Sequence, residues 1–336
     1  MTRAWRLEGA GADTLSLRPH TPGVPGPGEV RVRMQAAAIN NRDLAIAAGA
    51  YPNPPGIIPF SDGAGIVEQI GPGVEEFAPG DSVISCFYPA WESGPATARN
   101  HRQSLGCEMD GVLAEAIVLP ATALVHAPKS LTPEAAATLP CAGLTAWTAL
   151  FTEGGLRAGQ TVLIMGTGGV AVFALQLARL VGARSIVLSG SEAKAERARS
   201  MGAEVVIDYR RHPDWAQLVL DVTGGEGADL IIELGGQDTL PQSLQCVKVG
   251  GKICVIGVLS GLVAAVPVPP ILFRHIHITG ITVGHRDDLR TLCRAVDTNV
   301  LEPMIDARFA FEDAVSAYEA LPLGRHFGKL VVTMGT

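Results

Sequence analysis

The segment GTGGVA at residues 166–171 contains three glycines and ends in a small residue, and it directly follows the apolar run TVLIM at 161–165. A first glycine permits a tight turn, a second lets the backbone approach a pyrophosphate, and a small last residue lets a helix pack closely on the strand. The helix start then offers free N–H groups to an anion. We predict a dinucleotide-binding turn rather than an empty glycine-rich turn, with contacts from Gly166, Gly168, Gly169 and Val170.

The next expected strand ends in the segment LSGS at 188–191. NAD sites usually carry an acidic residue at this point for the ribose 2′-hydroxyl. Here Ser189 and Ser191 offer hydroxyls and Lys194 follows, which suits a 2′-phosphate of about −1.5 to −2 charges. Glu192 lies just beyond, where an acidic residue is also ordinary in the first turn of a helix. The sequence therefore favours NADPH over NADH.

Cys141 lies in the segment TLPCAGLTAWTAL at 138–150, and metal ligand, nucleophile and wall of a cleft are all open roles for it. No motif with a partnered histidine points to nucleophilic catalysis. His275 and His277 alternate on an expected strand and so share a face, but without a third ligand a surface or interface pair is favoured. Six cysteines without a C-x-x-C pattern indicate free thiols in a reducing cytoplasm.

The chain has 336 residues, 47% of them hydrophobic, and a formal net charge of −7. It can bury a large core, and its charge argues against nucleic acid or an anionic membrane as the main partner. The first residues contain no apolar signal segment. The uncharged runs 162–178 and 257–273 are interrupted by glycines or prolines and are slightly short for a membrane span of about 20 residues. We interpret both runs as buried core.

Strand-like and helix-like runs alternate from about residue 130, which predicts a doubly wound parallel sheet. Expected strands are 161–165, 185–188, 204–208, 229–234, 252–258 and 277–283, and expected helices are 170–181, 192–201, 213–223, 239–247 and 287–298. The first third is expected to be mostly β, with a loop at 88–110. The end of the chain, predicted as a helix and then a strand, is expected to complete that first domain. We therefore predict a catalytic domain at 1–125, completed by about 300–336, and a dinucleotide-binding domain at 126–299.

These segments, in their order and spacing, resemble the medium-chain dehydrogenase/reductase superfamily. The matching pieces are NNRD at 40–43, PFSDGAG at 59–65, GPGVEEFAPGD at 71–81, LPCAGLTAWTAL at 139–150, GTGGV at 166–170, ELGG at 233–236, GVLSG at 257–261 and HFGKLVV at 326–332. The resemblance implies a GroES-like catalytic domain beside a Rossmann domain, with the active site in the cleft between them. It also implies a homodimer formed through the edge strand HITGITV, because an exposed apolar edge needs covering.

Zinc-dependent members of this superfamily hold the catalytic metal with Cys, His and Cys. The resemblance places those positions at Asn40, Ser61 and Cys141, and only the last keeps a ligand side chain. Catalytic zinc usually needs three protein ligands, and one oxygen from Asp62 would still leave a poor site. The closely spaced cysteines of a structural zinc lobe are also missing. We therefore expect no zinc, and we expect Cys141 to be a former ligand position that lines the cleft.

The zincless branch that the chain most resembles includes NADPH-dependent quinone oxidoreductases and enone or enoyl reductases. Without a metal, the negative charge that develops on the acceptor oxygen must be stabilised by hydrogen-bond donors. Asn40 and Arg42 are candidate donors, and Tyr51, in a loop similar to G-x-Y-P, is a candidate proton donor because tyrosine has a pKa of about 10. A turn-holding role for Asn40, pairing of Arg42 with Asp43 and simple packing of Tyr51 remain alternatives.

The same resemblance implies further contacts with the cofactor. They are Tyr209 near the adenosine, and Thr145, Leu234, Gly257, Val258, Leu259, Ser260, Phe327 and Lys329 elsewhere along the dinucleotide. A zincless alcohol or aldehyde dehydrogenase on the same scaffold is an alternative function, and a cofactor-binding sensor or structural protein without turnover is another. The sequence identifies neither the physiological substrate nor the preferred direction of reaction.

Overall fold

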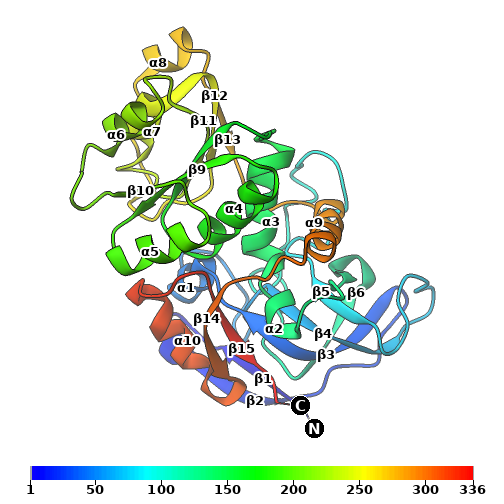
Figure 1. Ribbon diagram of the computed structural model, residues 1–336. Coiled ribbons are helices and arrows are strands. Elements are labelled where there is room, and N and C mark those ends of the chain that lie inside the picture. The colour runs from blue at the N-terminus through cyan, green and yellow to red at the C-terminus, as the bar shows by residue number, and fades with distance from the viewer. Residues whose placement is uncertain (1, 336) are drawn as a thin grey trace. The chain divides into compact units, whose positions relative to one another are not determined.

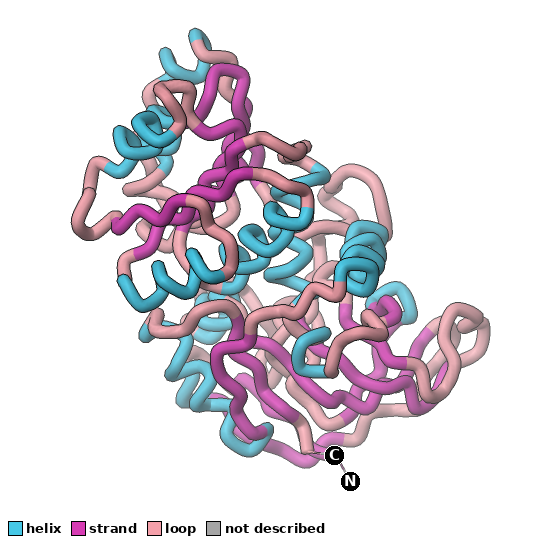
Figure 2. The backbone as a smooth tube through the Cα atoms, in the orientation of Figure 1, coloured by secondary structure: helices cyan, strands magenta, loops and turns pink. Residues whose placement is uncertain are grey.

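The computed structural model describes residues 2–335, which form two compact units (Figures 1 and 2). Unit 1 runs as far as Leu144 and resumes at Val283, and unit 2 is Thr145–Thr282. These boundaries differ from the expected 125/126 and 299/300. The first unit keeps the chain up to Leu144, and it also holds the helix that we expected in the dinucleotide-binding domain. No helix within residues 2–335 is long and apolar enough to cross a bilayer.

Unit 2 is built on a six-stranded sheet in which every pairing is parallel. The spatial order is β10-β9-β8-β11-β12-β13, so the chain runs outward from β8 to one edge and then returns to build the other half. This is the doubly wound Rossmann order. The strands are β8 Thr161–Met165, β9 Arg184–Ser189, β10 Val205–Asp208, β11 Ala228–Glu233, β12 Val247–Val255 and β13 His277–Gly280.

Helices cover both faces of this sheet, which explains why the central strands are apolar throughout; all five residues of β8 are buried. Right-handed crossovers place α4 and α5 on one face and α6 and α7 on the other (Figure 1). The helices are α3 Leu144–Trp147, which crosses the unit boundary, α4 Gly169–Leu180, α5 Glu192–Ser200, α6 Trp215–Val222, α7 Leu240–Cys246 and α8 Val268–Phe273. The predicted parallel sheet and its helix positions are confirmed within one to five residues at each boundary.

The interpretation of run 257–273 as buried core is wrong. The segment leaves β12 and ends in α8, and its large apolar side chains face solvent, with Leu262 83% and Phe273 77% exposed. Val258, Leu259, Val263, Val268 and Leu272 are also more than half exposed. The three prolines of this region prevent it from forming a regular strand in the sheet. The other run, 162–178, is largely buried as expected.

Unit 1 contains a seven-stranded sheet and a separate two-stranded ribbon of β1 and β2. The sheet order is β14-β15-β3-β4-β5-β7, and β6 also pairs with β3. The strands are β1 Thr2–Leu7, β2 Leu15–His20, β3 Glu29–Ala38, β4 Asp62–Ile70, β5 Ser82–Ser85, β6 Ala116–Pro120, β7 Leu124–His126, β14 Ile305–Ala310 and β15 Lys329–Thr333. Pairing of β15 with β3 confirms that the end of the chain completes the first unit.

The helices of unit 1 are α1 Asn41–Ala47, α2 Pro133–Ala136, α9 Arg286–Asn299 and α10 Ala314–Ala320. The expected helix start at Thr132 is confirmed, since its hydroxyl accepts a hydrogen bond from Ala135 N at 3.3 Å. The regular helix is short, however, and two π-helical turns at Leu139–Gly143 and Thr148–Thr152 flank α3. Cys141 lies in the first of these turns. Such turns are rare and often mark functional sites.

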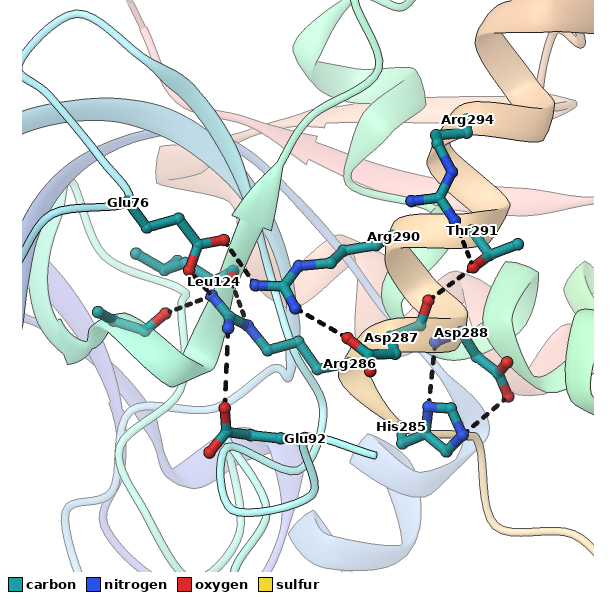
Figure 3. Close-up of polar contacts among 11 residues, drawn as sticks. Glu76, Glu92, Leu124, His285, Arg286, Asp287, Asp288, Arg290, Thr291 and Arg294 are labelled. Atoms are coloured by element: carbon teal, nitrogen blue, oxygen red, sulfur yellow. Dashed lines mark hydrogen bonds and ion pairs between the residues drawn. The ribbon is translucent and has the colours of Figure 1, made fainter. Parts of the chain in front are cut away.

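Arg286, at the start of α9, anchors that helix in unit 1 (Figure 3). Its buried guanidinium donates to Leu124 O at 2.8 Å, to Ala121 O at 3.1 Å and to the carboxylate of Glu76 at 2.8 Å. The neighbouring Arg290 also bonds to Glu76, at 2.7 Å, from a more exposed position. A buried guanidinium must keep such partners, so α9 belongs with the strands that supply them.

We expect Arg286→Met to destabilise unit 1 by about 2–4 kcal/mol, because the carbonyl oxygens of Leu124 and Ala121 lose their donor and Glu76 loses one of its two arginine partners. Arg290→Met is the matched control and should cost no more than about 1 kcal/mol, since its ion pair is partly exposed. Urea unfolding curves of the two variants measure the difference. Equal losses would show that Arg286 does not anchor α9.

Candidate active site

The predicted dinucleotide turn lies between β8 and α4, and its backbone has the geometry that such a turn needs. Gly166 adopts a left-handed conformation with φ of +77°, which a side chain would strain. Gly168 caps α4, whose helical residues begin at Gly169 and Val170. The first N–H groups of α4 therefore have no acceptor within the helix. Together with the helix dipole they form a site for a pyrophosphate.

The sheet order places this turn at a topological switch point. β8 and β11 are neighbours in the sheet, but the chain leaves them toward opposite edges. In doubly wound sheets, ligands bind outside the carboxyl ends of the strands at such a point. The turn at Gly166 follows the carboxyl end of β8, and the segment ELGG follows that of β11. The residues of unit 2 thus fit a dinucleotide.

The tip of β9 carries the residues expected to face the adenosine phosphate. The hydroxyl of Ser189 donates to Ser191 O at 3.0 Å and accepts from Ser191 N at 3.3 Å, which fixes the bend between them. Lys194 follows in the first turn of α5. The carboxylate of Glu192 is bound by Arg199 at 3.0 Å. That ion pair offsets the negative charge of Glu192, which would otherwise repel the 2′-phosphate of NADPH.

Two side chains beyond β10 cover this tip. A Cβ on residue 190 would lie 2.6 Å from the Tyr209 hydroxyl oxygen and 2.9 Å from Arg210 Nε, so both groups pack directly on Gly190. Asp208 accepts a hydrogen bond from Arg210 N at 2.9 Å, and its carboxylate lies 3.4 Å from Arg211 Nε. Tyr209 was among the predicted residues and Arg210 was not. A basic residue two positions after the expected strand 204–208 is not by itself a signal, because the contact with Gly190 depends on the order of the strands.

A buried carboxylate organises the loops beyond β11 and β12. Glu233, fully buried, accepts hydrogen bonds from the N–H groups of Gly235 and Gly236 at 2.9 and 3.1 Å. It also accepts from the hydroxyls of Thr239 and Ser243, each at 2.5 Å. Four donors compensate for the burial of its charge. Sequence reasoning quoted this residue in a motif but gave it no role.

The loop shaped by Glu233 is joined to the predicted cofactor segment at 257–260. Leu259 N donates to Leu234 O at 3.3 Å, and Ser260 N donates to Gly235 O at 2.8 Å. Gly257 packs on the backbone of Leu234, where a side chain would clash. The structure therefore brings Leu234, Gly257, Val258, Leu259 and Ser260 together in unit 2, beside the switch point.

A second polar cluster lies in unit 1, around the buried ammonium of Lys329. Its Nζ donates to Ile39 O at 2.6 Å and to Asn40 Oδ1 at 2.5 Å. The amide of Asn40 donates to Ala38 O at 3.5 Å, and the buried carboxylate of Asp62 interacts electrostatically with Lys329. Burial raises the pKa of Asp62, while Lys329 and the hydrogen bonds oppose that shift. The predicted residues Asn40 and Lys329 are therefore direct partners.

Arg42 and Asp43 follow Asn40 in α1 but have separate environments. The guanidinium of Arg42 donates to Leu105 O at 2.8 Å and to Ser104 Oγ at 2.7 Å, and it lies 4.2 Å from the centre of the Phe87 ring. No Arg42–Asp43 ion pair is present within residues 2–335. Asp43 accepts from Asn40 N at 2.7 Å, and burial raises its pKa to about 7.

The three positions that the resemblance aligns with zinc ligands do not fit a zinc ion. Asn40 Oδ1 faces the ammonium of Lys329, and the hydroxyl of Ser61 donates to Asp62 Oδ1 at 2.6 Å. The backbone N–H of Cys141 donates to Asp62 Oδ2 at 3.1 Å, and burial raises the pKa of the Cys141 thiol far above its usual range. No group of three His, Cys, Asp or Glu side chains in residues 2–335 could hold a metal ion.

The remaining predicted residues occupy contrasting environments. Tyr51 is 49% exposed in the turn after α1, and its role as a proton donor remains a prediction. Phe327 is buried in unit 1, two residues before Lys329. Thr145 is buried in unit 2, in α3. His277 is the first residue of β13, but His275 precedes the strand and has a left-handed backbone with φ of +50°, so the two histidines do not alternate on one strand as expected. Their interpretation as a surface or interface pair remains a prediction.

Two family models match the chain. The alcohol dehydrogenase GroES-like domain matches residues 26–129, and the zinc-binding dehydrogenase model matches residues 169–298. A zinc-type alcohol dehydrogenase-like protein of Schizosaccharomyces pombe is 41% identical, with 94% of each chain covered. A quinone oxidoreductase of Pseudomonas aeruginosa is 32% identical, with 96% of each covered. Among solved structures, an NAD-dependent alcohol dehydrogenase superposes with a TM-score of 0.91 at 35% identity, covering 99% of this chain and all of the other.

The pKa of Asp43 predicts how stability changes with pH. Between its ordinary pKa of about 4 and the raised value of about 7, the unfolded chain releases a proton that the folded chain keeps. Stability should therefore fall as pH rises through this window, by on the order of 4 kcal/mol in all. Asp43→Asn carries no such proton, and its Oδ1 still accepts from Asn40 N. The melting temperature of this variant should rise relative to the parent between pH 5 and pH 8.

Asp297→Asn supplies a control of opposite sign. Burial tends to raise the pKa of Asp297, but hydrogen bonds from Ser130 N at 2.9 Å and Ser130 Oγ at 2.8 Å outweigh that effect and lower it. A lowered pKa contributes stability that is present above the ordinary value, so this variant should lose stability at neutral pH. A pH-independent difference between Asp43→Asn and the parent would contradict the assignment of a protonated Asp43.

Proposed function

The chain belongs to the medium-chain dehydrogenase/reductase superfamily, in its quinone oxidoreductase-like branch, and from this premise we propose that it transfers hydride from NADPH to a quinone or an α,β-unsaturated carbonyl without a metal ion. The observation that carries the proposal is the glycine turn at the switch point of the unit 2 sheet, where Gly166 and Gly168 leave room for a pyrophosphate beside the start of α4. When bound, the reduced nicotinamide supplies the hydride.

The residues of the chain supply binding and charge stabilisation. The turn at 166–170 holds the pyrophosphate, and the loops joined around Glu233 hold the nicotinamide half of the dinucleotide. A conjugated acceptor would receive hydride at carbon and develop negative charge on oxygen, which hydrogen-bond donors would stabilise in place of a metal ion. The cluster of Asn40, Asp62 and Lys329 in unit 1 concentrates polar groups. The misfit of the zinc-ligand positions supports an acceptor that does not need a divalent cation.

The cofactor is proposed to be NADPH on the strength of the β9 tip. Ser189 and Ser191 line the bend, Lys194 follows, and Tyr209 and Arg210 pack on Gly190 from the neighbouring strand. The nearby acidic groups of Glu192 and Asp208 are each paired with an arginine. A 2′-phosphate would therefore meet hydroxyls and cations, while each of the two nearby carboxylates is paired with an arginine.

A panel of acceptors tests the proposed reaction. Purified protein should oxidise NADPH with quinones or enones, and a strong chelator should leave the rate unchanged. Reduction of simple aldehydes that the chelator abolishes would indicate a metal-dependent alcohol dehydrogenase instead. Aldehyde reduction that resists the chelator would favour the zincless alternative. Tight NADPH binding without turnover on any acceptor would favour a sensor or structural protein.

We expect Arg210→Gln to lower kcat/KM for NADPH by about 10- to 100-fold, because a charge-assisted hydrogen bond contributes about 1.5–3 kcal/mol. The value for NADH should change little, since that cofactor lacks the 2′-phosphate. Arg211→Gln is the matched control, because its guanidinium pairs with Asp208. A parent protein that binds NADH more tightly than NADPH would contradict the assignment of the cofactor.

We also propose that two copies of the chain associate through the β13 edge of unit 2. The strand ends the sheet, and Ile278 on it is 39% exposed. The apolar side chains of segment 258–273 add a solvent-exposed surface in the same unit, of a kind that monomers rarely leave uncovered. A second copy would cover both the open strand edge and this surface.

The double variant Leu272→Glu/Phe273→Glu should shift the protein from dimer to monomer in size-exclusion chromatography with light scattering, because it places charges on the proposed interface. Val24→Glu is the control, since Val24 is 79% exposed and belongs to unit 1, whereas the proposed interface consists of unit 2 residues. A monomeric parent at micromolar concentration would exclude this interface.

A further inference from the structure

We propose that Glu233 is a positioning residue for the nicotinamide half of the dinucleotide: its buried carboxylate holds two loops of unit 2 in the conformation that receives this half. The inference rests on the proposed function, because it requires that unit 2 binds a dinucleotide. Every residue that it uses lies in unit 2.

The order of the strands indicates which loops the nicotinamide half meets. A doubly wound sheet consists of two mononucleotide-binding halves, and the dinucleotide lies across the point where the strand order reverses. Here β8, β9 and β10 form one half, and β11, β12 and β13 form the other. The adenosine ribose binds at the end of the second strand, which is β9. With the pyrophosphate at the turn after β8, the other mononucleotide extends toward the ends of β11 and β12.

The loop after β11 closes around the side chain of Glu233, the last residue of that strand. Oε1 accepts three hydrogen bonds, from Gly235 N at 2.9 Å, Gly236 N at 3.1 Å and Thr239 Oγ1 at 2.5 Å. Oε2 accepts from Ser243 Oγ in α7 at 2.5 Å. If the loop opened, the fully buried carboxylate would lose these donors, which would be very costly. Glu233 therefore holds the loop closed and acts through it.

The main chain of Glu233 fixes the loop after β12. Its carbonyl oxygen accepts from Ile256 N at 2.9 Å and from Gly257 N at 3.2 Å. Further along the same loop, Ser260 Oγ donates to Gly235 O at 3.0 Å. One residue is thus hydrogen-bonded to both loops, and the loops are hydrogen-bonded to each other.

Two glycines let the loops pack backbone against backbone. Gly236 has a left-handed conformation with φ of +88°, and a Cβ on it would lie 2.8 Å from Gly261 O. A Cβ on Gly257 would lie 2.3 Å from Leu234 O. Loops that are already ordered spare the cofactor the cost of ordering them on binding. They also hold the nicotinamide in one place, which hydride transfer requires.

Glu233→Met tests this role through the two halves of the cofactor, because 2′,5′-ADP contains only the adenosine half and NADPH contains both. The variant removes every side-chain acceptor at this position. We expect the dissociation constant for NADPH to rise about 10- to 100-fold, the effect of ordering one or two loop residues only on binding. The dissociation constant for 2′,5′-ADP should change less than about 3-fold, because its site is independent of these loops. Isothermal titration calorimetry measures both constants.

Two further variants separate positioning from a general effect on stability. Glu233→Gln keeps an oxygen for the three donors of Oε1, and the hydroxyl of Ser243 can rotate to accept from the new amide, so most of the NADPH affinity should return. Asp229→Asn is the matched control, since Asp229 lies near the opposite end of β11 and accepts from Thr161 N at 2.8 Å. It should change neither dissociation constant by more than about 3-fold.

The outcomes distinguish failure of the inference from failure of the proposed function. An equal rise of both dissociation constants in Glu233→Met would show that the residue supports unit 2 as a whole, and two unchanged constants would show that it does not order the loops. Either result overturns the inference and leaves the proposed reaction intact. Absence of dinucleotide binding by the parent would instead overturn the proposed function. If Glu233→Met does not fold, Thr239→Val removes one of the four donors and should give a smaller rise for NADPH alone.

Discussion

The ammonium of Lys329 is buried and therefore needs polar partners, and this need determines how the polar cluster of unit 1 is assembled. Lys329 is the first residue of β15, Asn40 lies just beyond the end of β3, and Asp62 is the first residue of β4. The antiparallel registers bring these three points together, since Ala38 pairs with both Asp62 and Val331. An unpaired ammonium could not stay buried, so Lys329 needs polar partners beside it. The register of the three strands places Asn40 and Asp62 where they can serve as those partners. The polar cluster is thus a consequence of where three strands meet.

Unit 2 could be predicted from sequence because its signals are local. Each parallel strand is an apolar run of a few residues, and each helix follows within a short loop. The glycine turn is contained in six residues, so its position at the end of β8 followed directly. The contact of Arg210 with Gly190 was missed for the opposite reason. It joins the ends of two different strands, β9 and β10, and only the sheet order shows that these ends are neighbours.

Unit 1 was predictable in outline through the resemblance, but its partnerships were not. Asn40 and Lys329 are 289 positions apart, and the type of neither residue predicts that the other is its partner. Arg286 was placed in the wrong domain because periodicity identifies a helix without showing which strands supply acceptors for its first residue. The prediction that run 257–273 is buried core was wrong for a different reason. Hydrophobicity shows that a segment avoids water, but it does not show whether the same chain or another molecule covers it.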